Sequence, residues 1–321
     1  MNYKPIILVG GEPYSIFFEI FFKSLNKKNY KSPIILIASK NLLIKQMKKM
    51  NFNFKLNELK KDNIDFKSLK KKKINLINVN FTFKKTFDEI TDKSNIYISN
   101  CFKIALELMK TNKYSGLING PISKKNFLKG KFLGITEYLA NKTNRKNKIA
   151  MLIYNKKLSV SPLTTHLPLK KVHKNLSKDK IINHVKLISK FYKKHTSNEP
   201  KIAITGLNPH CESNYCSSEE DKIIKPAIKY LVSKKYKIKG PFAADTIFMK
   251  QQLKKYDVII GMYHDQVLTP IKALFGFNAI NITLGLPFIR ISPDHGPNSL
   301  MLNKNLSNPD SLIEALNFLD K

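Results

Sequence analysis

Residues 257–296 read DVIIGMYHDQVLTPIKALFGFNAINITLGLPFIRISPDHG. The first five match a buried strand, and His264 and Asp265 stand just beyond its carboxyl end. A second strand of this kind spans 278–284, and Arg290 follows it in the same polar, glycine-containing stretch. In open α/β sheets, ligands bind at the carboxyl ends of strands. The segment therefore predicts an α/β fold with an active site at these strand ends.

Short apolar strands alternate with amphipathic helices along the rest of the chain, which is typical of a mostly parallel sheet covered by helices. We expect strands at 5–9, 33–38, 74–79, 115–119, 148–154, 157–163, 201–206, 256–261 and 278–284. We expect helices near 15–27, 40–50, 95–112, 177–195, 217–234, 245–255, 266–275 and 309–319. The pattern fits two α/β lobes around a cleft, with a polar surface excursion at 55–73.

Two helix starts carry capping signals. Ser217 and Glu220 have the spacing of a capping box, and Asn308 before Pro309 reads as an N-cap followed by a proline in the first turn.

The bulk composition indicates a globular enzyme of the cytoplasm rather than a membrane or secreted protein. The chain has 321 residues and is 42% hydrophobic, but no apolar run reaches the roughly 18–20 residues of a membrane span. The apolar run at 5–9 is too short for a signal peptide. The three cysteines are an odd number without zinc-ribbon spacing, so we interpret them as reduced thiols.

The net charge of +34 comes from lysine. Only Arg145 and Arg290 are arginines, and lysines are scattered through every segment together with asparagine, isoleucine and phenylalanine, as in an AT-rich genome. We therefore favour a lysine-covered enzyme surface over a nucleic-acid-binding module. Arg290 stands out because a lysine cannot replace the planar, bidentate guanidinium group.

Three histidines follow predicted strands: His166, His210 and His264. Their side chains either converge on one catalytic metal with open positions for substrate, or are unrelated loop histidines. The remaining four are weaker candidates. His173, His184 and His195 are expected to face solvent from a lysine-rich region, and His295 is either structural or cofactor-facing. No G-x-G-x-x-G follows the first strand, so an ordinary Rossmann domain is not expected.

Motifs along the whole chain resemble the 4-hydroxythreonine-4-phosphate dehydrogenase family. They are Gly-Glu-Pro at 11–13, NGPISK at 119–124, TEYLA at 136–140, TTHLPL at 164–169, GLNPH at 206–210, GPFAADT at 240–246, YHDQ at 263–266 and NITLGLPFIR at 281–290. The resemblance implies a three-layer α/β/α fold of the isocitrate/isopropylmalate dehydrogenase kind. It places residues 1–125 with 275–321 in a nucleotide-side lobe, and 126–274 in a lobe for metal, substrate and dimer contacts.

The resemblance also implies roles for single residues. His166, His210 and His264 become ligands of one divalent metal per subunit (zinc, cobalt or magnesium), shared across a homodimer interface. Thr136, Lys272, Asn281 and Arg290 match substrate-binding positions. Asp245 and Asp265 are candidates for proton handling or for supporting a ligand histidine, with a helix N-cap as the alternative for Asp265. Asp294, His295 and Gly296 are candidates for the NAD side, with NADP as an alternative cofactor.

The chain departs from the family pattern at two places. Ile135 stands where the family normally has histidine, so one substrate hydrogen bond is missing. Residues 297–305 replace an alanine- and glycine-rich loop that lies near the nucleotide in this fold, and glycines there allow close backbone approach.

The activity implied by the resemblance is NAD- and metal-dependent oxidation and decarboxylation of 4-phosphohydroxy-L-threonine to an amino-ketone phosphate, in pyridoxal phosphate biosynthesis. Two alternatives stay open. Ile135 is compatible with a sibling enzyme for a threonate or erythronate phosphate, and the altered loop is compatible with a catalytically weakened binding protein of the same fold.

Overall fold

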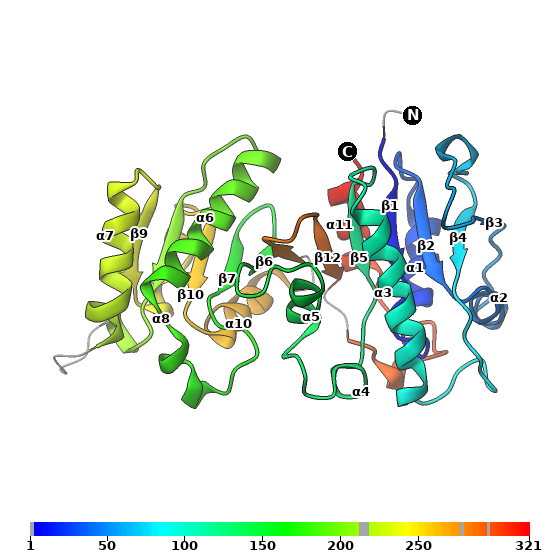
Figure 1. Cartoon of the computed structure of the whole chain (residues 1–321). Helices are drawn as coiled ribbons and strands as arrows, with labels where there is room; N and C mark the ends of the chain where they lie inside the picture. The colour runs from blue at the N-terminus through cyan, green and yellow to red at the C-terminus, as the bar shows by residue number, and fades with distance from the viewer. Residues whose placement is uncertain (1–2, 212–217, 277–278, 294–295) are drawn as a thin grey trace. The chain divides into compact units, whose positions relative to one another are not determined.

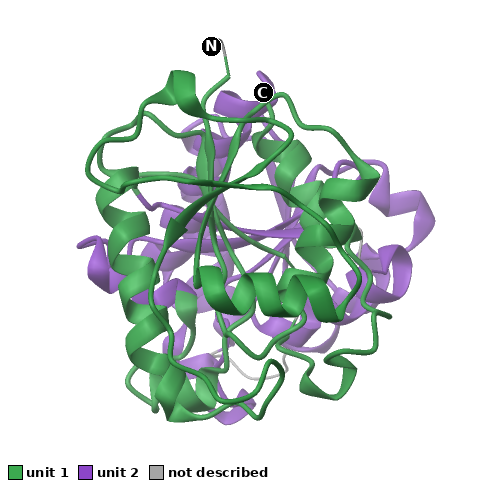
Figure 2. Ribbon diagram, turned by 90° about the vertical axis from the view of Figure 1, so that its right-hand side faces the viewer, with its two compact units in different colours: residues 1–135, 287–321 green, residues 136–286 purple. Residues whose placement is uncertain are grey.

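The computed structural model describes residues 3–211, 218–276, 279–293 and 296–321. The chain divides into two compact units, coloured green and purple in Figure 2: unit 1 holds residues 1–135 and 287–321, and unit 2 holds 136–286. The expected lobes had their bounds at 125/126 and 274/275. The second boundary lies later because the strand at 280–284 pairs with a strand of unit 2.

Unit 1 is built on a parallel sheet with the strand order β3-β4-β2-β1-β5-β12 (Figure 1). The strands are β1 (Ile6–Val9), β2 (Ile34–Ala38), β3 (Leu56–Glu58), β4 (Ile74–Asn78), β5 (Gly116–Asn119) and β12 (Arg290–Pro293). The main helices are α1 (Phe17–Lys27), α2 (Lys40–Lys49), α3 (Asn95–Met109) and α11 (Asp310–Leu319), and the short α4 spans Lys124–Leu128. With right-handed crossovers, α1 and α2 cover one face and α3 covers the other, which makes three layers.

Unit 2 has a mixed sheet with the order β11-β6-β7-β10-β8-β9. The strands are β6 (Ala150–Tyr154), β7 (Ser159–Pro162), β8 (Ile202–Thr205), β9 (Ile238–Phe242), β10 (Val258–Gly261) and β11 (Ile280–Leu284). The helices are α5 (Ile135–Lys142), α6 (Lys178–His195), α7 (Lys225–Ser233), α8 (Ala244–Ile247), α9 (Lys250–Leu253) and α10 (His264–Phe275). β6 runs antiparallel to β7 and β11, whereas β7, β10, β8 and β9 are parallel.

All nine predicted strands are confirmed, and their apolar residues are buried in the sheet, although some strands, such as β7 (Ser159–Pro162), also carry polar residues. Three further strands were not predicted. β3 lies inside the stretch 55–73 that was expected to be a surface excursion, β9 contains Gly240 and Pro241, and β12 begins with a charged residue. Such short or interrupted strands lack the apolar pattern on which a sequence prediction depends. Helices α4 and α5 were likewise not predicted.

The core of unit 1 is dominated by α1 and β1. All four residues of β1 are fully buried, and Phe17, Phe18, Phe21 and Phe22 bury one face of α1. Burying one such side chain stabilises the fold by roughly 1.5–3 kcal/mol. The carboxyl end of β1 is therefore a rigid base for the residues that follow it.

His184 was expected to face solvent, and this prediction was wrong. Only 5% of its surface is exposed, because it lies on the face of α6 that also carries Ile181 and Ile188. The Ser161 hydroxyl donates to the Met151 carbonyl and accepts a hydrogen bond from His184 Nε2 at 2.7 Å. Burial lowers the pKa of His184 to about 3, so this imidazole is neutral. His173, by contrast, is exposed as predicted.

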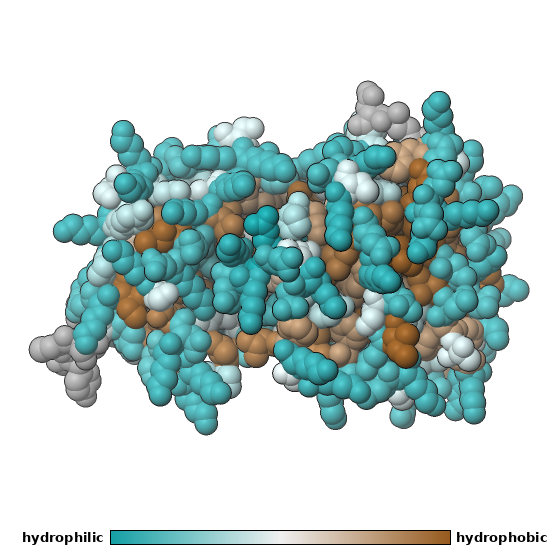
Figure 3. All heavy atoms as spheres, viewed as in Figure 1, coloured by the Kyte–Doolittle hydropathy of each residue, from teal (hydrophilic) through white to brown (hydrophobic). Residues whose placement is uncertain are grey.

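The surface matches the lysine-rich composition. Hydrophilic side chains cover most of the face drawn in Figure 3, and brown apolar surface shows between them. Within the described residues, no helix combines the length and apolar character needed to cross a membrane. Cys101 and Cys211 are free thiols, whereas Cys216 lies outside the described residues.

Candidate functional site

Two of the three candidate histidines of unit 2 lie side by side. β7 and β10 are parallel neighbours, and beyond their carboxyl ends the Thr164 hydroxyl donates to the Met262 carbonyl at 2.7 Å. This bond aligns the segments that carry His166 and His264, whose ring centres are 5.8 Å apart. Two imidazoles that share a metal, at about 2.1 Å from each nitrogen, have ring centres roughly 5 to 6 Å apart. The pair therefore fits a common metal ion.

Asp265 contacts one of these histidines directly. His264 Nδ1 and Asp265 Oδ1 are 2.6 Å apart, and the side chain of Asp265 is 81% exposed. With the proton on Nδ1, the carboxylate orients the ring and leaves Nε2 available as a ligand. The alternative role of Asp265 as a helix N-cap was wrong, because Tyr263 occupies the N-cap of α10 and makes no side-chain cap.

His210 is on the turn Pro209–Cys211 that follows β8, and its side chain is exposed. Helix α8, which carries the exposed Asp245, lies against this turn. Among the described residues, no group of three or more His, Cys, Asp or Glu side chains is arranged to hold a metal within this one chain. His210 as third ligand, shared across a homodimer interface, therefore stays a prediction.

Two polar side chains meet between α5 and β11, and a third lies on the same face of β11. Thr136 Oγ1 and Thr283 Oγ1 are 3.5 Å apart, and Asn281 is two residues before Thr283 on the same face of β11. Asn281 Oδ1 is buried and accepts no hydrogen bond from any described residue. An acceptor left in this state costs roughly 1–3 kcal/mol, so the position fits a ligand that supplies a donor. Lys272 is exposed on α10.

Glu137 is a polar residue of this region to which the sequence analysis assigned no role. Its Oε1 accepts a hydrogen bond from the Thr165 hydroxyl at 3.2 Å, next to His166 in the chain. Its Oε2 is buried without a hydrogen-bond partner in the described parts of the chain. Its position in the TEYLA motif was the feature of the sequence that could have marked Glu137 as a candidate site residue.

Arg290 and Asn119 form a buried pair in unit 1. β12 runs beside β5, and Arg290 Nε donates to Asn119 Oδ1 at 2.7 Å. Both residues are 2% exposed. A buried guanidinium requires partners for its fixed donors, and carboxylates and phosphates supply these bidentately. Asn119 belongs to the NGPISK motif but had no predicted role.

A buried carboxyl group follows β1 in the same unit. Gly11 has φ +71°, and a Cβ atom there would lie 2.6 Å from the Pro121 carbonyl, so only glycine fits this turn. Glu12 is 1% exposed, and neither carboxylate oxygen has a hydrogen-bond partner among the described residues. Burial raises the pKa of Glu12 to about 7, and Ser94 and Ser123 offset this only in part.

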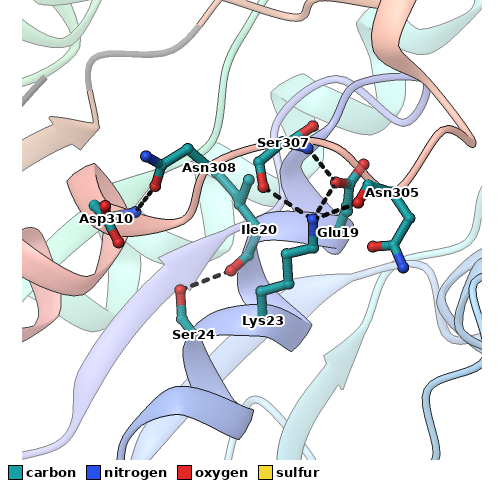
Figure 4. A network of polar contacts seen from close by, with 8 residues as sticks. All are labelled: Glu19, Ile20, Lys23, Ser24, Asn305, Ser307, Asn308 and Asp310. Atoms are coloured by element: carbon teal, nitrogen blue, oxygen red, sulfur yellow. Dashed lines mark hydrogen bonds and ion pairs between the residues drawn. The ribbon is translucent and has the colours of Figure 1, made fainter.

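The altered loop at 297–305 is attached to α1 at both of its ends. The Pro297 carbonyl accepts a hydrogen bond from the Ile16 N–H at 3.2 Å. Lys23 Nζ donates to the carbonyls of Asn305 at 2.8 Å and Ser307 at 3.0 Å, and to Glu19 Oε1 at 2.8 Å (Figure 4).

Asparagines take over the backbone role of glycine in this loop. Asn298, Asn303 and Asn305 have φ values of +47°, +63° and +54°. Asparagine is the residue that best tolerates this left-handed region after glycine. Of the predicted cofactor-facing residues, Gly296 is exposed, whereas Asp294 and His295 lie outside the described residues.

Comparison with known proteins gives consistent matches over the whole chain. The family model for "Pyridoxal phosphate biosynthetic protein PdxA" matches residues 29–319. A 4-hydroxythreonine-4-phosphate dehydrogenase from Sulfurihydrogenibium sp. (strain YO3AOP1) is 40% identical over 311 residues, which cover 95% of this chain and 94% of that protein.

Solved structures agree. The crystal structure of the 4-hydroxythreonine-4-phosphate dehydrogenase from Klebsiella pneumoniae has a TM-score of 0.84 at 27% identity, with 98% of both chains covered. An isocitrate dehydrogenase from Methylococcus capsulatus has a TM-score of 0.51 at 8% identity, covering 97% of this chain and 83% of that one. The second match concerns the fold alone, and it confirms the isocitrate dehydrogenase-like architecture predicted from the sequence.

Proposed function

Because this chain belongs to the PdxA family of pyridoxal phosphate biosynthetic proteins, we propose that it oxidises and decarboxylates 4-phosphohydroxy-L-threonine with NAD and a divalent metal. The substrate hydroxyl loses its proton to a base, and the carbon that bears this hydroxyl gives its hydride to nicotinamide. The resulting β-keto acid then loses carbon dioxide and leaves an amino-ketone phosphate.

The paired imidazoles of His166 and His264 are the observation that carries this proposal. With His210, they would hold the metal across the interface of a homodimer. A divalent cation held there would supply Lewis-acid chemistry, which lowers the pKa of a bound hydroxyl and polarises a carbonyl. Asp265 keeps His264 in the ligand tautomer, and Asp245, exposed beside the turn that carries His210, is the second candidate for proton handling.

The remaining site residues would bind the substrate and the cofactor. Thr136 and Asn281 offer a hydroxyl and an acceptor oxygen, and Lys272 and Arg290 offer charge for phosphate and carboxylate. Residues 294–296 and the loop after them would contact NAD. The enzyme would work in the cytoplasm.

A second candidate is a sibling enzyme for a threonate or erythronate phosphate. Ile135 supports it, because the side chain is 8% exposed and supplies no hydrogen bond where the family has an imidazole.

The test is NAD reduction by purified protein with 4-phosphohydroxy-L-threonine, before and after chelation and metal replacement. We expect chelation to abolish turnover and metal to restore it. His166→Ala and His264→Ala should lose bound metal, whereas His173→Ala, on an exposed turn, should not. Full turnover after complete metal removal would contradict the proposal. Calorimetry that detects no NAD binding, with or without substrate analogue, would favour the catalytically weakened binding protein.

A further inference from the structure

We propose that Gln266 and Glu220 are positioning residues that fix, within each subunit, the strand-end segments that present His264 and His210 as metal ligands. Neither side chain belongs to the ligand set, and both are buried in unit 2, with exposed fractions of 8% for Gln266 and 0% for Glu220. The inference rests on the proposed function, because it takes His210 and His264 as metal ligands.

Gln266 joins the carboxyl ends of β8 and β10. Its Oε1 accepts hydrogen bonds from the Met262 N–H at 2.7 Å and the Thr205 hydroxyl at 2.9 Å. Its Nε2 donates to the Gly206 carbonyl at 2.8 Å. One amide side chain therefore fixes the backbone two residues before His264 and four residues before His210.

Met262 links the hydrogen bonds of Gln266 to the segment that carries the third histidine, His166. Its N–H donates to Gln266, and its carbonyl accepts hydrogen bonds from both the Thr164 hydroxyl and the Thr164 N–H, at 2.7 and 3.2 Å. Thr164 is two residues before His166. The backbone of Met262 thus connects the segments of all three candidate ligands through Thr164 and Gln266.

Glu220 holds the segment between β8 and His210. Its Oε1 accepts hydrogen bonds from the N–H groups of Leu207 at 2.7 Å and Asn208 at 2.8 Å, and its Oε2 accepts from Asn208 Nδ2 at 2.8 Å. These three bonds differ from the capping-box role expected for Glu220; its expected partner, Ser217, lies outside the described residues. The carboxylate instead acts as a clamp on the GLNPH motif.

The clamped segment adopts a conformation that needs such support. His210 and Cys211 have consecutive φ values of +57° and +58°, which non-glycine residues rarely adopt. The packing is also tight, since a Cβ atom on Gly206 would lie 2.7 Å from Cys211 Sγ and 2.9 Å from Glu220 Oε1. Without Glu220, the two backbone N–H groups lose their partner, and the turn that presents His210 is free to relax.

The chain offers graded variants and a matched control. Gln266→Met removes all three hydrogen bonds at similar volume, whereas Gln266→Glu keeps an acceptor for Met262 and loses the donor to Gly206. Glu220→Ala removes the clamp, and Glu220→Gln keeps an acceptor for the two N–H groups. The control is Glu219→Gln, because half-buried Glu219 receives only one bond from this segment, from Asn208 Nδ2 at 3.0 Å.

The test titrates the full-length protein and its variants with Co²⁺ and follows the visible absorption bands of the bound ion, together with turnover and thermal unfolding. We expect Gln266→Met and Glu220→Ala to weaken cobalt affinity about tenfold or more and to change the bands. In turnover, kcat should fall more than KM rises. Glu220→Gln should recover most of the affinity, and Glu219→Gln should stay within about twofold of the unmodified protein.

Altered stability alone would not support the inference. If Gln266→Met or Glu220→Ala fails to fold, Gln266→Glu provides the comparison, because it loses the donor to the Gly206 carbonyl and should still weaken cobalt affinity. Folded Gln266→Met, Gln266→Glu or Glu220→Ala with unchanged cobalt affinity and bands would overturn the positioning role and leave the proposed function intact. An unmodified protein that binds no cobalt would overturn the metal site itself and this inference with it.

Discussion

Arg290 donates a hydrogen bond from Nε to Asn119 Oδ1 over 2.7 Å, although the two residues are 171 positions apart in the chain. The pair joins β12 to the end of β5 inside unit 1. It explains why an arginine persists at this position in a chain that uses lysine almost everywhere. A lysine would keep the charge but lose the planar set of donors that Asn119 helps to orient.

On the proposed role of Arg290 as a partner of the substrate anion, Arg290→Lys should reduce kcat/KM about tenfold or more, because loss of such a desolvated contact costs roughly 1–3 kcal/mol. Steady-state kinetics measure the loss, and thermal unfolding shows whether the fold survives. Exposed Arg145→Lys is the control and should be neutral. Near-normal kinetics for Arg290→Lys would place Arg290 outside the anion site.

Ile135→His should leave turnover of 4-phosphohydroxy-L-threonine unchanged or raise it, because an imidazole restores the hydrogen-bonding group normal at this position. Kinetics on this substrate and on threonate phosphate would measure the effect, with Ile135→Val as a control that changes only volume. Lower turnover of 4-phosphohydroxy-L-threonine would contradict the account of a simple lost contact. Since Ile135 is buried, that outcome would indicate an unsatisfied imidazole in a reshaped pocket.

Glu12 should make unfolding dependent on pH. Its pKa is about 7 in the folded protein against an ordinary value of 4.5, so well below pH 4.5 the group is protonated in both states and costs nothing. As pH rises towards 7, the unfolded chain ionises first, and the folded state loses roughly 3 kcal/mol by pH 7 to 8. Glu12→Gln should remove this loss.

Denaturant unfolding at pH 5 and pH 8 measures the Glu12 effect as the difference between the two proteins, which cancels the other titrating groups. Between pH 5 and pH 8, the free energy of unfolding of Glu12→Gln should rise relative to that of the unmodified protein. Parallel pH profiles would show that Glu12 is ionised or hydrogen-bonded in solution.

Lys23→Met should destabilise unit 1 by roughly 1–3 kcal/mol, because Glu19, which is 2% exposed, would keep a buried carboxylate with one fewer donor. The carbonyls of Asn305 and Ser307 would lose their partner too. Lys27→Met is the control on the same helix. The Lys27–Asp310 pair is exposed and 3.4 Å long, so its loss should be close to neutral in chemical unfolding. Equal effects of the two variants on the free energy of unfolding would contradict the role of Lys23 in holding Asn305 and Ser307 to α1.

Asn303→Gly should be neutral or slightly stabilising, whereas Asn303→Ala should cost about 1 kcal/mol, because φ is +63° and alanine tolerates this region poorly. Asn53→Ala, at an exposed position without a positive φ, supplies the control. Unfolding free energies give the comparison. Identical values for the glycine and alanine variants would mean that the loop has a different backbone in solution.

The sequence alone determined the class of fold, nine of the strands and the family. These features follow from local patterns, since a buried parallel strand reads as a continuous apolar run and a covering helix repeats every 3.6 residues. The strand-end positions of His166, His210 and His264 were also readable, because residues after such runs must lie at the carboxyl edge of the sheet.

Only the tertiary structure decided which polar groups meet. Gln266 bonds to Gly206, which is 60 residues away, and Arg290 bonds to Asn119, 171 residues away, and neither spacing carries a pattern. A hydrogen bond depends on the final approach of two atoms to about 3 Å, and this is set by packing of the whole unit rather than by neighbours in the chain.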